Sequence, residues 1–569
     1  MSWRSRRSVP PPQPFPLDYA AHLPRYKELS RNNFPAILHC WTSQQWHPIT
    51  KSVGYFLTST NADIIKQMAR VWAKDSSKLS KDACAKAIVG GLATPSTVQA
   101  VVNSLSPFER AGLGLLKRHG QIAPTEEFAI ELFMLGLPLP VPDRRYAYGY
   151  HRDNDPLYGA LNSLLRKGLV LAREWDQIYG YAREAQMDQY HYRPEVFSDQ
   201  RLLARVEVTP PVELSLKPVA NAGESGISLQ PAEVVLRFVS MVETLRKLGR
   251  IDITSKGRLA KPFLTKLTKA LGWESALENA ADTPLPQATL FFFKLIQSAG
   301  FLQSRPDLNG LEVNPQANTL FEASYNTQAT AWINGYRSLK QWAEYTPQGM
   351  YFEDDEPSSH TKFPTIRAAL LMALAALPNA SAWYRLSDLS EAIYERIGDN
   401  FSLLYFYGFS PAYGTKPEEE AKHRAEWQKK NHSRWRVTEQ EWITHAMTGP
   451  LYHLGLVTLA RAASGKTDEP ALFRLTSLGR SVWYDASRTP GETSTEALLT
   501  VAPDGPCWVV QPNFDVVVYL DRASAPRLAF IERIAARKPS TGATALYHLT
   551  RETVPRWNQE SRQTRWLIP

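Results

Sequence analysis

The chain has 569 residues, which is well beyond the length at which one hydrophobic core keeps growing, so several domains are expected. Hydrophobic residues make up 43% and charged residues 21%, and these values exclude a largely disordered or fibrous protein. Lys and Arg outnumber Asp and Glu by 65 to 56, and the net charge of +9 is compatible with nucleic acid, an anionic membrane surface or no polyanion at all.

Cysteine usage and hydropathy narrow the cellular setting. Cys40, Cys84 and Cys507 are far apart, which excludes a disulfide framework and a four-thiolate zinc site. No run approaches the roughly 20 apolar residues that span a bilayer, and the Arg- and Pro-rich start lacks the apolar core of a signal peptide. We therefore expect a cytoplasmic protein whose residues 1–18 form a disordered basic tail.

Residues 19–105 are predicted to be a helical region. Apolar positions recur three and four apart over 63–72 and 80–90. The segment is similar to the SAP modules that hold DNA with lysines on one helix, through Ile64, Met68, Lys78, Lys81, Ala85, Lys86 and Ile88. An ordinary helical subdomain explains the same spacing and is the preferred interpretation.

A new domain is predicted to open at Ser106. Glu109 follows three residues later, which is the reciprocal capping pattern of a helix start. After a second helix, residues 155–167 form a third that Gly168 ends, and 169–175 begin a strand. Three helices followed by a hairpin are the element order of a winged-helix domain.

The same order is predicted twice more beyond a Pro-, Ser- and Gly-rich linker. In the second domain helices are expected at 231–248, 259–271 and 290–299, before a hairpin over 301–313 that turns at Asn309-Gly310. In the third domain helices are expected at 365–377, 386–397 and 439–454, before two strands within 456–475. An acidic connector with Glu353, Asp354, Asp355 and Glu356 lies between the two domains and is expected to face solvent.

The last region changes to an α+β pattern. Residues 507–510, 516–520 and 546–549 are predicted strands, and 527–537 a helix. The string WVVQPNFDVVVYL, the helix and then YHLTRETV at 547–554 resemble the domain that precedes the ATPase core in XPB-type helicases. With the upstream units, the chain is similar to bacterial helicase-associated domain proteins, in which this domain is thought to contact DNA beside a motor. Relatives usually continue with a further amphipathic helix, whereas the end of this chain is short and basic.

The expected fold class is mainly α with α+β parts: tandem winged-helix-like domains followed by a small α+β domain. The predicted divisions are a tail (1–18), a helical SAP-like region (19–105), winged-helix-like domain 1 (106–205), a linker (206–229), winged-helix-like domain 2 (230–345), an acidic linker (346–361), winged-helix-like domain 3 (362–490), an XPB-like domain (495–554) and an irregular tail (555–569).

No catalytic, cofactor or metal site is predicted. The string ARAASGKT at 460–467 meets a relaxed phosphate-loop pattern, with Lys466 and Thr467 in the ligand places. Asp468, Glu469 and Pro470 follow directly. The two carboxylates would repel a triphosphate, and Pro470 would obstruct the required helix, so a solvent-facing hairpin tip explains the string better. His39, Cys40 and His47 lack a fourth ligand nearby for a zinc site.

The functional hypothesis is a non-catalytic DNA-binding accessory that acts on duplex or forked DNA with a separate helicase or nuclease, in DNA repair or defence. The alternatives are a protein–protein scaffold of winged-helix domains, which neutral or acidic third helices would favour, and a helicase-class protein without its ATPase core. The DNA-binding candidates are cations near the third helices, in the wings, in the densest basic run and near the C-terminus. The competing interpretation is that these side chains are simply solvated. The candidates are Arg166, Lys167, Lys256, Arg258, Lys261, Lys266, Lys269, Arg305, Lys466 and Arg551.

Overall fold

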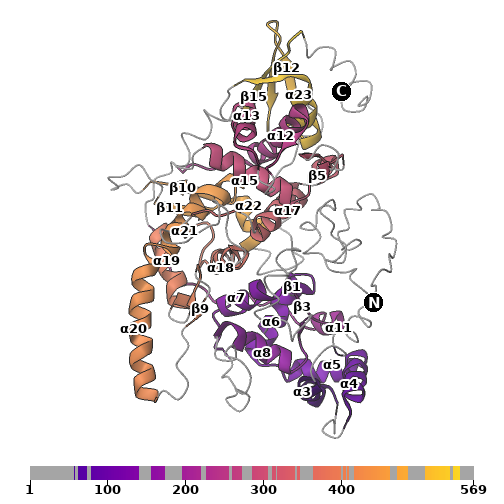
Figure 1. Ribbon diagram of the computed structural model, residues 1–569, viewed down its shortest axis with the longest axis vertical. Helices are drawn as coiled ribbons and strands as arrows, with labels where there is room; N and C mark the ends of the chain where they lie inside the picture. The colour runs from indigo at the N-terminus through magenta and orange to yellow at the C-terminus, as the bar shows by residue number, and fades with distance from the viewer. Residues whose placement is uncertain are drawn as a thin grey trace.

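A computed structural model gives the structure of the chain (Figure 1). It describes residues 57, 62–73, 79–139, 156–172, 195–219, 226–254, 259–271, 285–305, 310–315, 317–323, 325–339, 342–345, 363–398, 401–404, 407–408, 416–461, 471–484, 506–538 and 543–551. The expected N-terminal tail, the possible metal ligands near Cys40, the acidic connector and the C-terminal tail all lie outside these residues.

Three helices open the described chain at the lower end of the molecule in Figure 1. They are α3 (Ala62–Trp72), α4 (Lys81–Ala93) and α5 (Pro95–Asn103). The first two were predicted from their apolar spacing, and α5 was not. Trp72 anchors the group to the next unit, because its indole nitrogen donates a 3.0 Å hydrogen bond to the carbonyl of Lys167.

The first unit places three helices around a small antiparallel sheet. Its elements are α6 (Pro107–Arg118), β1 (Ile122–Pro124), α7 (Thr125–Met134), α8 (Pro156–Arg166), β2 (Leu171–Ala172) and β3 (Glu195–Phe197). The sheet order is β1-β3-β2, and the short helix α11 (Gln200–Leu203) follows. The capping box predicted at Ser106 is confirmed, since the Ser106 hydroxyl accepts from the Glu109 amide at 3.2 Å and the Glu109 carboxylate accepts from the Ser106 amide at 3.0 Å.

The second unit repeats this element order. It contains α12 (Pro231–Leu248), β4 (Ile251–Asp252), α13 (Lys261–Leu271), α15 (Leu285–Ser298), β5 (Leu302–Arg305) and β6 (Gly310–Val313), and its sheet order is β4-β6-β5. The predicted first helix and the pairing of two strands within 301–313 are confirmed. The predicted turn at Asn309-Gly310 is wrong, because Gly310 already belongs to β6 and pairs with Arg305. Two further helices, α16 (Ala317–Glu322) and α17 (Tyr325–Ser338), follow and were not predicted.

The third unit has the same order with an insertion. Its elements are α18 (Phe363–Ala375), β7 (Tyr384–Arg385), α19 (Leu386–Ile393), α21 (Glu439–Ala446), β10 (Val457–Ala460) and β11 (Leu472–Leu475), with the sheet order β10-β11-β7. The π-helical turns η5 (Tyr394–Gly398) and η6 (Met447–Leu451) extend α19 and α21, and α22 (Ser477–Gly479) with η7 (Arg480–Tyr484) ends the unit. The insertion holds β8 (Phe401–Ser402), β9 (Tyr407–Gly408) and α20 (Pro417–Trp435), which projects from the body in Figure 1.

The three sheets share one topology. In each, the first strand precedes the second helix, the last strand lies in the middle, and every pairing is antiparallel. Each first strand has only two or three residues, too few to show a period in the sequence, and for this reason the first strands were not predicted.

The C-terminal unit, at the upper end of Figure 1, is an antiparallel sheet covered on one face by a helix. Its order is β12-β13-β15-β14, from β12 (Trp508–Val510), β13 (Asp515–Tyr519), β14 (Ala536–Lys538) and β15 (Thr544–His548). The helix, α23 (Ala525–Ile534), ends earlier than predicted. Residues 536–538 instead pair with β15 as an edge strand, so sheet pairing overrides the helical spacing of this segment.

The segment expected to be a linker is hydrogen-bonded to the first and third units. The amide of Val212 donates a 2.9 Å hydrogen bond to the carbonyl of Leu135, and the amide of Leu214 donates a 2.8 Å hydrogen bond to the carbonyl of Ala376. A β-carbon added at Gly114 would lie 2.4 Å from the carbonyl oxygen of Glu207, so the segment also presses against α6. Its polar composition therefore does not mark a free linker, because its described part bonds to two units through its backbone.

Apolar burial is continuous from α3 to the C-terminal sheet. Among the helices of the described residues, none is both long enough and apolar enough to cross a bilayer.

Candidate nucleic-acid interface

Helix α13 presents the densest group of exposed cations among the predicted residues. Lys261, Lys266 and Lys269 are exposed, and we call this group the lysine face. At 100° per residue they span an arc of about 140°, opposite the buried residues Phe263, Leu267 and Leu271. The helix sequence KPFLTKLTKAL contains no carboxylate, and no ion pair to the three lysines is found in the described parts of the chain.

The other candidates lie outside the described residues or on other elements. Lys256, Arg258 and Lys466 lie outside the described residues, although the first two precede α13 directly in sequence. Arg305 ends β5, and its side chain is also outside the description. Arg551 is exposed just beyond β15. Among the candidates whose side chains are described, Lys261, Lys266 and Lys269 thus lie together on one helix face.

Lys167 has a structural partner. Its ammonium lies 2.5 Å from a carboxylate oxygen of Glu109, the buried capping residue of α6. Neighbouring Arg166 is half-buried at the end of α8. Because the charge of Lys167 is matched at short range, it is a weaker phosphate ligand than its position suggested.

The third helices of the three units are largely buried. The described side chains of α8 contact α7 and α3, and Phe291, Phe292 and Phe293 of α15 are each at most 1% exposed. The only cation of α15, Lys294, is itself 6% exposed. The outward side chains of α21 include Glu441 and His445. Within the described residues, no third helix offers the exposed basic face that enters a major groove.

The first and second units are joined by a buried ion cluster. His119 lies 2.5 Å from a Glu131 oxygen, and Arg337 of α17 donates to the other oxygen of this carboxylate. Burial would raise the pKa of Glu131, but Arg337 and His119 outweigh it and lower the pKa from 4.5 to about 2. Burial lowers the pKa of His119 from 6.5 to about 4, so the ring is neutral and donates to the carboxylate. These groups are engaged in packing and are not accessible to a substrate.

A second buried cluster joins α17, α18 and α21. The Arg367 guanidinium, 0% exposed, donates to Glu344 at 2.6 Å and to the carbonyl of Trp342 at 2.7 Å. Glu344 also accepts from the hydroxyl of Tyr336 at 2.7 Å and from the indole of Trp442 at 3.1 Å. The carboxylate is therefore fully engaged, which suits a structural role.

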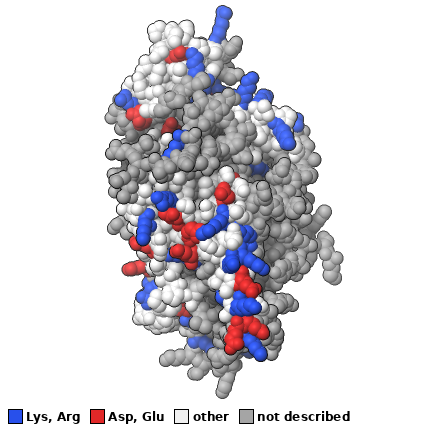
Figure 2. Space-filling model, turned by 90° about the vertical axis from the view of Figure 1, so that its left-hand side faces the viewer, with Lys and Arg blue, Asp and Glu red and all other residues white. Residues whose placement is uncertain are grey.

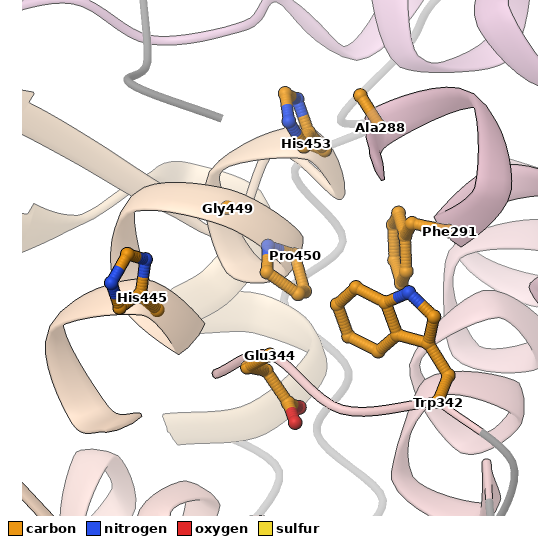
Figure 3. A pocket seen from close by; sticks show the side chains of 8 residues that line it. All are labelled: Ala288, Phe291, Trp342, Glu344, His445, Gly449, Pro450 and His453. Carbon is orange, nitrogen blue, oxygen red and sulfur yellow. The ribbon is translucent and has the colours of Figure 1, made fainter. Parts of the chain in front are cut away.

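A small cavity lies beside this cluster, between α15 and η6 (Figure 3). Its volume is about 20 Å³, enough for about one water molecule and far too small for a nucleotide. His453 lines it, with Nδ1 3.1 Å from Arg237 and a buried Nε2 that has no hydrogen-bond partner among the described residues. Since arginine can only donate, Nδ1 accepts and the proton sits on Nε2. Burial, followed by the charge of Arg237, lowers the pKa of His453 well below its ordinary value, which keeps the ring neutral.

The strands beside the GKT string form an antiparallel hairpin, as predicted. Ala460 of β10 pairs with Leu472 of β11, so the string connects two strands of one small sheet, whereas a phosphate loop would run from a strand into a helix. No cluster of metal-ligating side chains is found within the described residues. Cys84 and Cys507 are buried free thiols.

Charge on the surface is mixed rather than segregated. Figure 2 shows Lys and Arg interspersed with Asp and Glu on one side of the molecule, instead of a continuous basic field. Helix α20 contributes both signs, with three glutamates in its first turn and His432 and Arg434 in its last. This order of charges matches the helix dipole, so part of the charge stabilises the helix itself.

Comparison with known proteins does not identify the chain: no protein-family model matches it, and neither does any curated protein sequence.

Proposed function

We propose that the three units are winged-helix domains and that the protein is a non-catalytic accessory that binds duplex DNA through phosphate contacts at the lysine face of α13. The repeated sheet order, with the last strand in the middle, supports the first part. The observation that carries the second part is the exposure of Lys261, Lys266 and Lys269 opposite the buried side of a helix without carboxylates.

The buried third helices define the kind of binding that we propose. A domain whose third helix is packed inside cannot place it in the major groove, where base edges are read. Lysines on an exposed helix contact phosphates, which carry no direct sequence information. We therefore propose binding that depends on charge and is indifferent to sequence, beside a separate helicase or nuclease that supplies the chemistry.

The test compares two variants with the same change of charge. Replacing Lys261, Lys266 and Lys269 by Ala should weaken binding to a labelled 20-base-pair duplex, measured by fluorescence anisotropy over a series of salt concentrations. The slope of log K against log salt should become shallower by about 2.7, because each phosphate contact contributes about 0.9. The control replaces the exposed lysines of α20, Lys422, Lys429 and Lys430, by Ala.

Two results would refute the proposal. One is an equal loss in both triple variants, which would mean a nonspecific effect of net charge. The other is an affinity that does not change with salt, which would favour the second candidate function, a protein–protein scaffold. The specific observation behind that candidate is the neutral or acidic character of the exposed part of α21.

A further inference from the structure

Strand β12 of the C-terminal unit is an edge strand with exposed apolar side chains. Val509 and Val510 are 45% and 46% exposed, and Phe514, in the turn after the strand, is 62% exposed. These are three of the six large hydrophobic residues exposed among the described residues. Edge strands usually carry charges that prevent further pairing, yet residues 509–514 (VVQPNF) contain none.

One side of the β12 backbone has no pairing partner among the described residues. The carbonyl of Cys507 accepts a 2.8 Å hydrogen bond from the amide of Tyr519 in β13, and the amide of Gln511 donates a 2.7 Å hydrogen bond to the carbonyl of Asp515. In an antiparallel pair, the backbone groups of successive residues point alternately toward the partner strand and away from it. The amide and carbonyl of Val509 therefore also point toward β13, whereas those of Trp508 and Val510 point away from the sheet. No bond to these outward groups is found in the described part of the chain.

Phe514 occupies the left-handed position of the hairpin turn between β12 and β13, where a residue other than phenylalanine is usual. Its φ of +64° lies in the left-handed region, which favours glycine or asparagine. The turn is fixed there, because the Phe514 amide donates to Gln511 at 2.9 Å and its carbonyl accepts from Leu549 at 2.9 Å. The turn therefore holds an aromatic ring in solvent at a backbone cost, which is typical of a residue kept for contact with a partner.

We propose that β12 and Phe514 form a docking site for an extended segment of a partner protein, which adds to the sheet as a fifth strand. The outward backbone groups define the partner chemistry, because amides and carbonyls spaced two residues apart match another strand. The uncharged surface favours a peptide over a polyanion. A second copy of the chain fits less well, because three strand residues and one ring are far fewer than the roughly 20 residues a side of a stable dimer.

The site has a defined length and side-chain preference. Pro506 and Pro512 lack amide protons and bracket the strand, so pairing is confined to Trp508–Val510. A bound strand would place alternate side chains beside Val509 and Val510, and one end would reach Phe514. We expect short peptides with alternating β-branched residues and a terminal apolar residue.

The experiment selects nine-residue peptides from a phage-displayed library against the full chain and measures the enriched synthetic peptide by fluorescence anisotropy. The key variant is Val510→Pro, which removes an outward amide proton and leaves the bonds between β12 and β13 in place. It should weaken binding about tenfold, as expected for one lost backbone hydrogen bond, whereas the control Val510→Thr should bind like the unmodified chain. Phe514→Gly should bind more weakly while it raises the apparent Tm, because it relieves the positive φ.

A measurement on the unmodified protein makes the test independent of variant folding. Amide hydrogen exchange of Trp508 and Val510 should slow when the peptide binds, while that of Val509, already bonded to β13, should stay unchanged. The proposal is overturned if no peptide is enriched, if Val510→Pro binds as tightly as Val510→Thr, or if sedimentation shows that β12 pairs with a second copy instead. The lysine-face triple variant should bind the peptide normally, so failure here is distinct from failure of DNA binding.

Discussion

His119 and Glu131 show how one buried contact fixes two protonation states. The neutral ring donates to the carboxylate, and Arg337 supplies the balancing charge. Removing one partner of such a cluster leaves an uncompensated buried charge, which typically costs about 3–5 kcal/mol. The cluster is therefore expected to hold the first unit and α17 in one arrangement.

Stability should fall in mild acid because of His119. Its pKa is about 4 in the folded chain against 6.5 for the ordinary value, so between these pH values the unfolded chain binds more protons. The stabilisation is complete above pH 6.5 and is lost as pH falls toward 4, by up to about 3 kcal/mol. His119→Gln should flatten this part of the profile of apparent Tm against pH relative to the unmodified chain. An unchanged slope in His119→Gln would contradict the assignment.

The residue scale also shows what the sequence could not reveal. The exposure of Lys261, Lys266 and Lys269 follows from helical spacing, because the apolar residues of α13 mark the opposite side. The pairing of Lys167 does not, since its partner Glu109 is 58 positions away in sequence. Arg367 lies in an otherwise apolar run, and its buried partner Glu344 comes from a separate segment. Contacts between distant segments carry no local pattern.

At the scale of elements, local spacing predicted the amphipathic helices well and the polar ones poorly. Helix α12 begins and ends as predicted because its apolar residues and Gly249 mark it clearly. Helix α20 is polar on nearly all sides, so it has no apolar stripe to detect. The buried third helices α8 and α15 were predicted as helices, but their apolar character reflects packing inside the molecule instead of a groove-reading surface.

The capping box of α6 should contribute measurably to stability. Ser106→Ala removes the acceptor for the Glu109 amide and should cost about 1 kcal/mol, seen as a lower apparent Tm and faster amide exchange in the first turn of α6. Ser80 is the matched control, because it caps α4 through a single 3.3 Å bond without a reciprocal partner. Ser80→Ala should therefore cost less. An equal or larger loss at Ser80 would show that the reciprocal bond adds nothing.

At the scale of the molecule, buried polar contacts bind the C-terminal unit to the second unit. Glu243 of α12 is fully buried and accepts from Arg533 of α23 at 2.9 and 3.1 Å. Ser240 of the same helix donates to Glu532 at 2.6 Å, and Glu532 also accepts from Tyr547 of β15 at 2.8 Å. Because these bonds join segments about 290 residues apart, the position of the C-terminal sheet depends on α12.

Glu243→Ala should loosen this junction without unfolding the first unit. The substitution leaves Arg533 and Arg246 facing each other without their shared carboxylate, and the repulsion and lost bonds should cost about 3–5 kcal/mol. Amide exchange should accelerate in α23 and β15, and proteases should cut near the junction, while exchange in α6 and α7 stays as in the unmodified chain. The exposed Glu322→Gln is the control and should change neither readout. Uniform acceleration through all units would mean that the chain unfolds as one cooperative body, and unchanged exchange in α23 would mean that apolar packing alone fixes the C-terminal sheet.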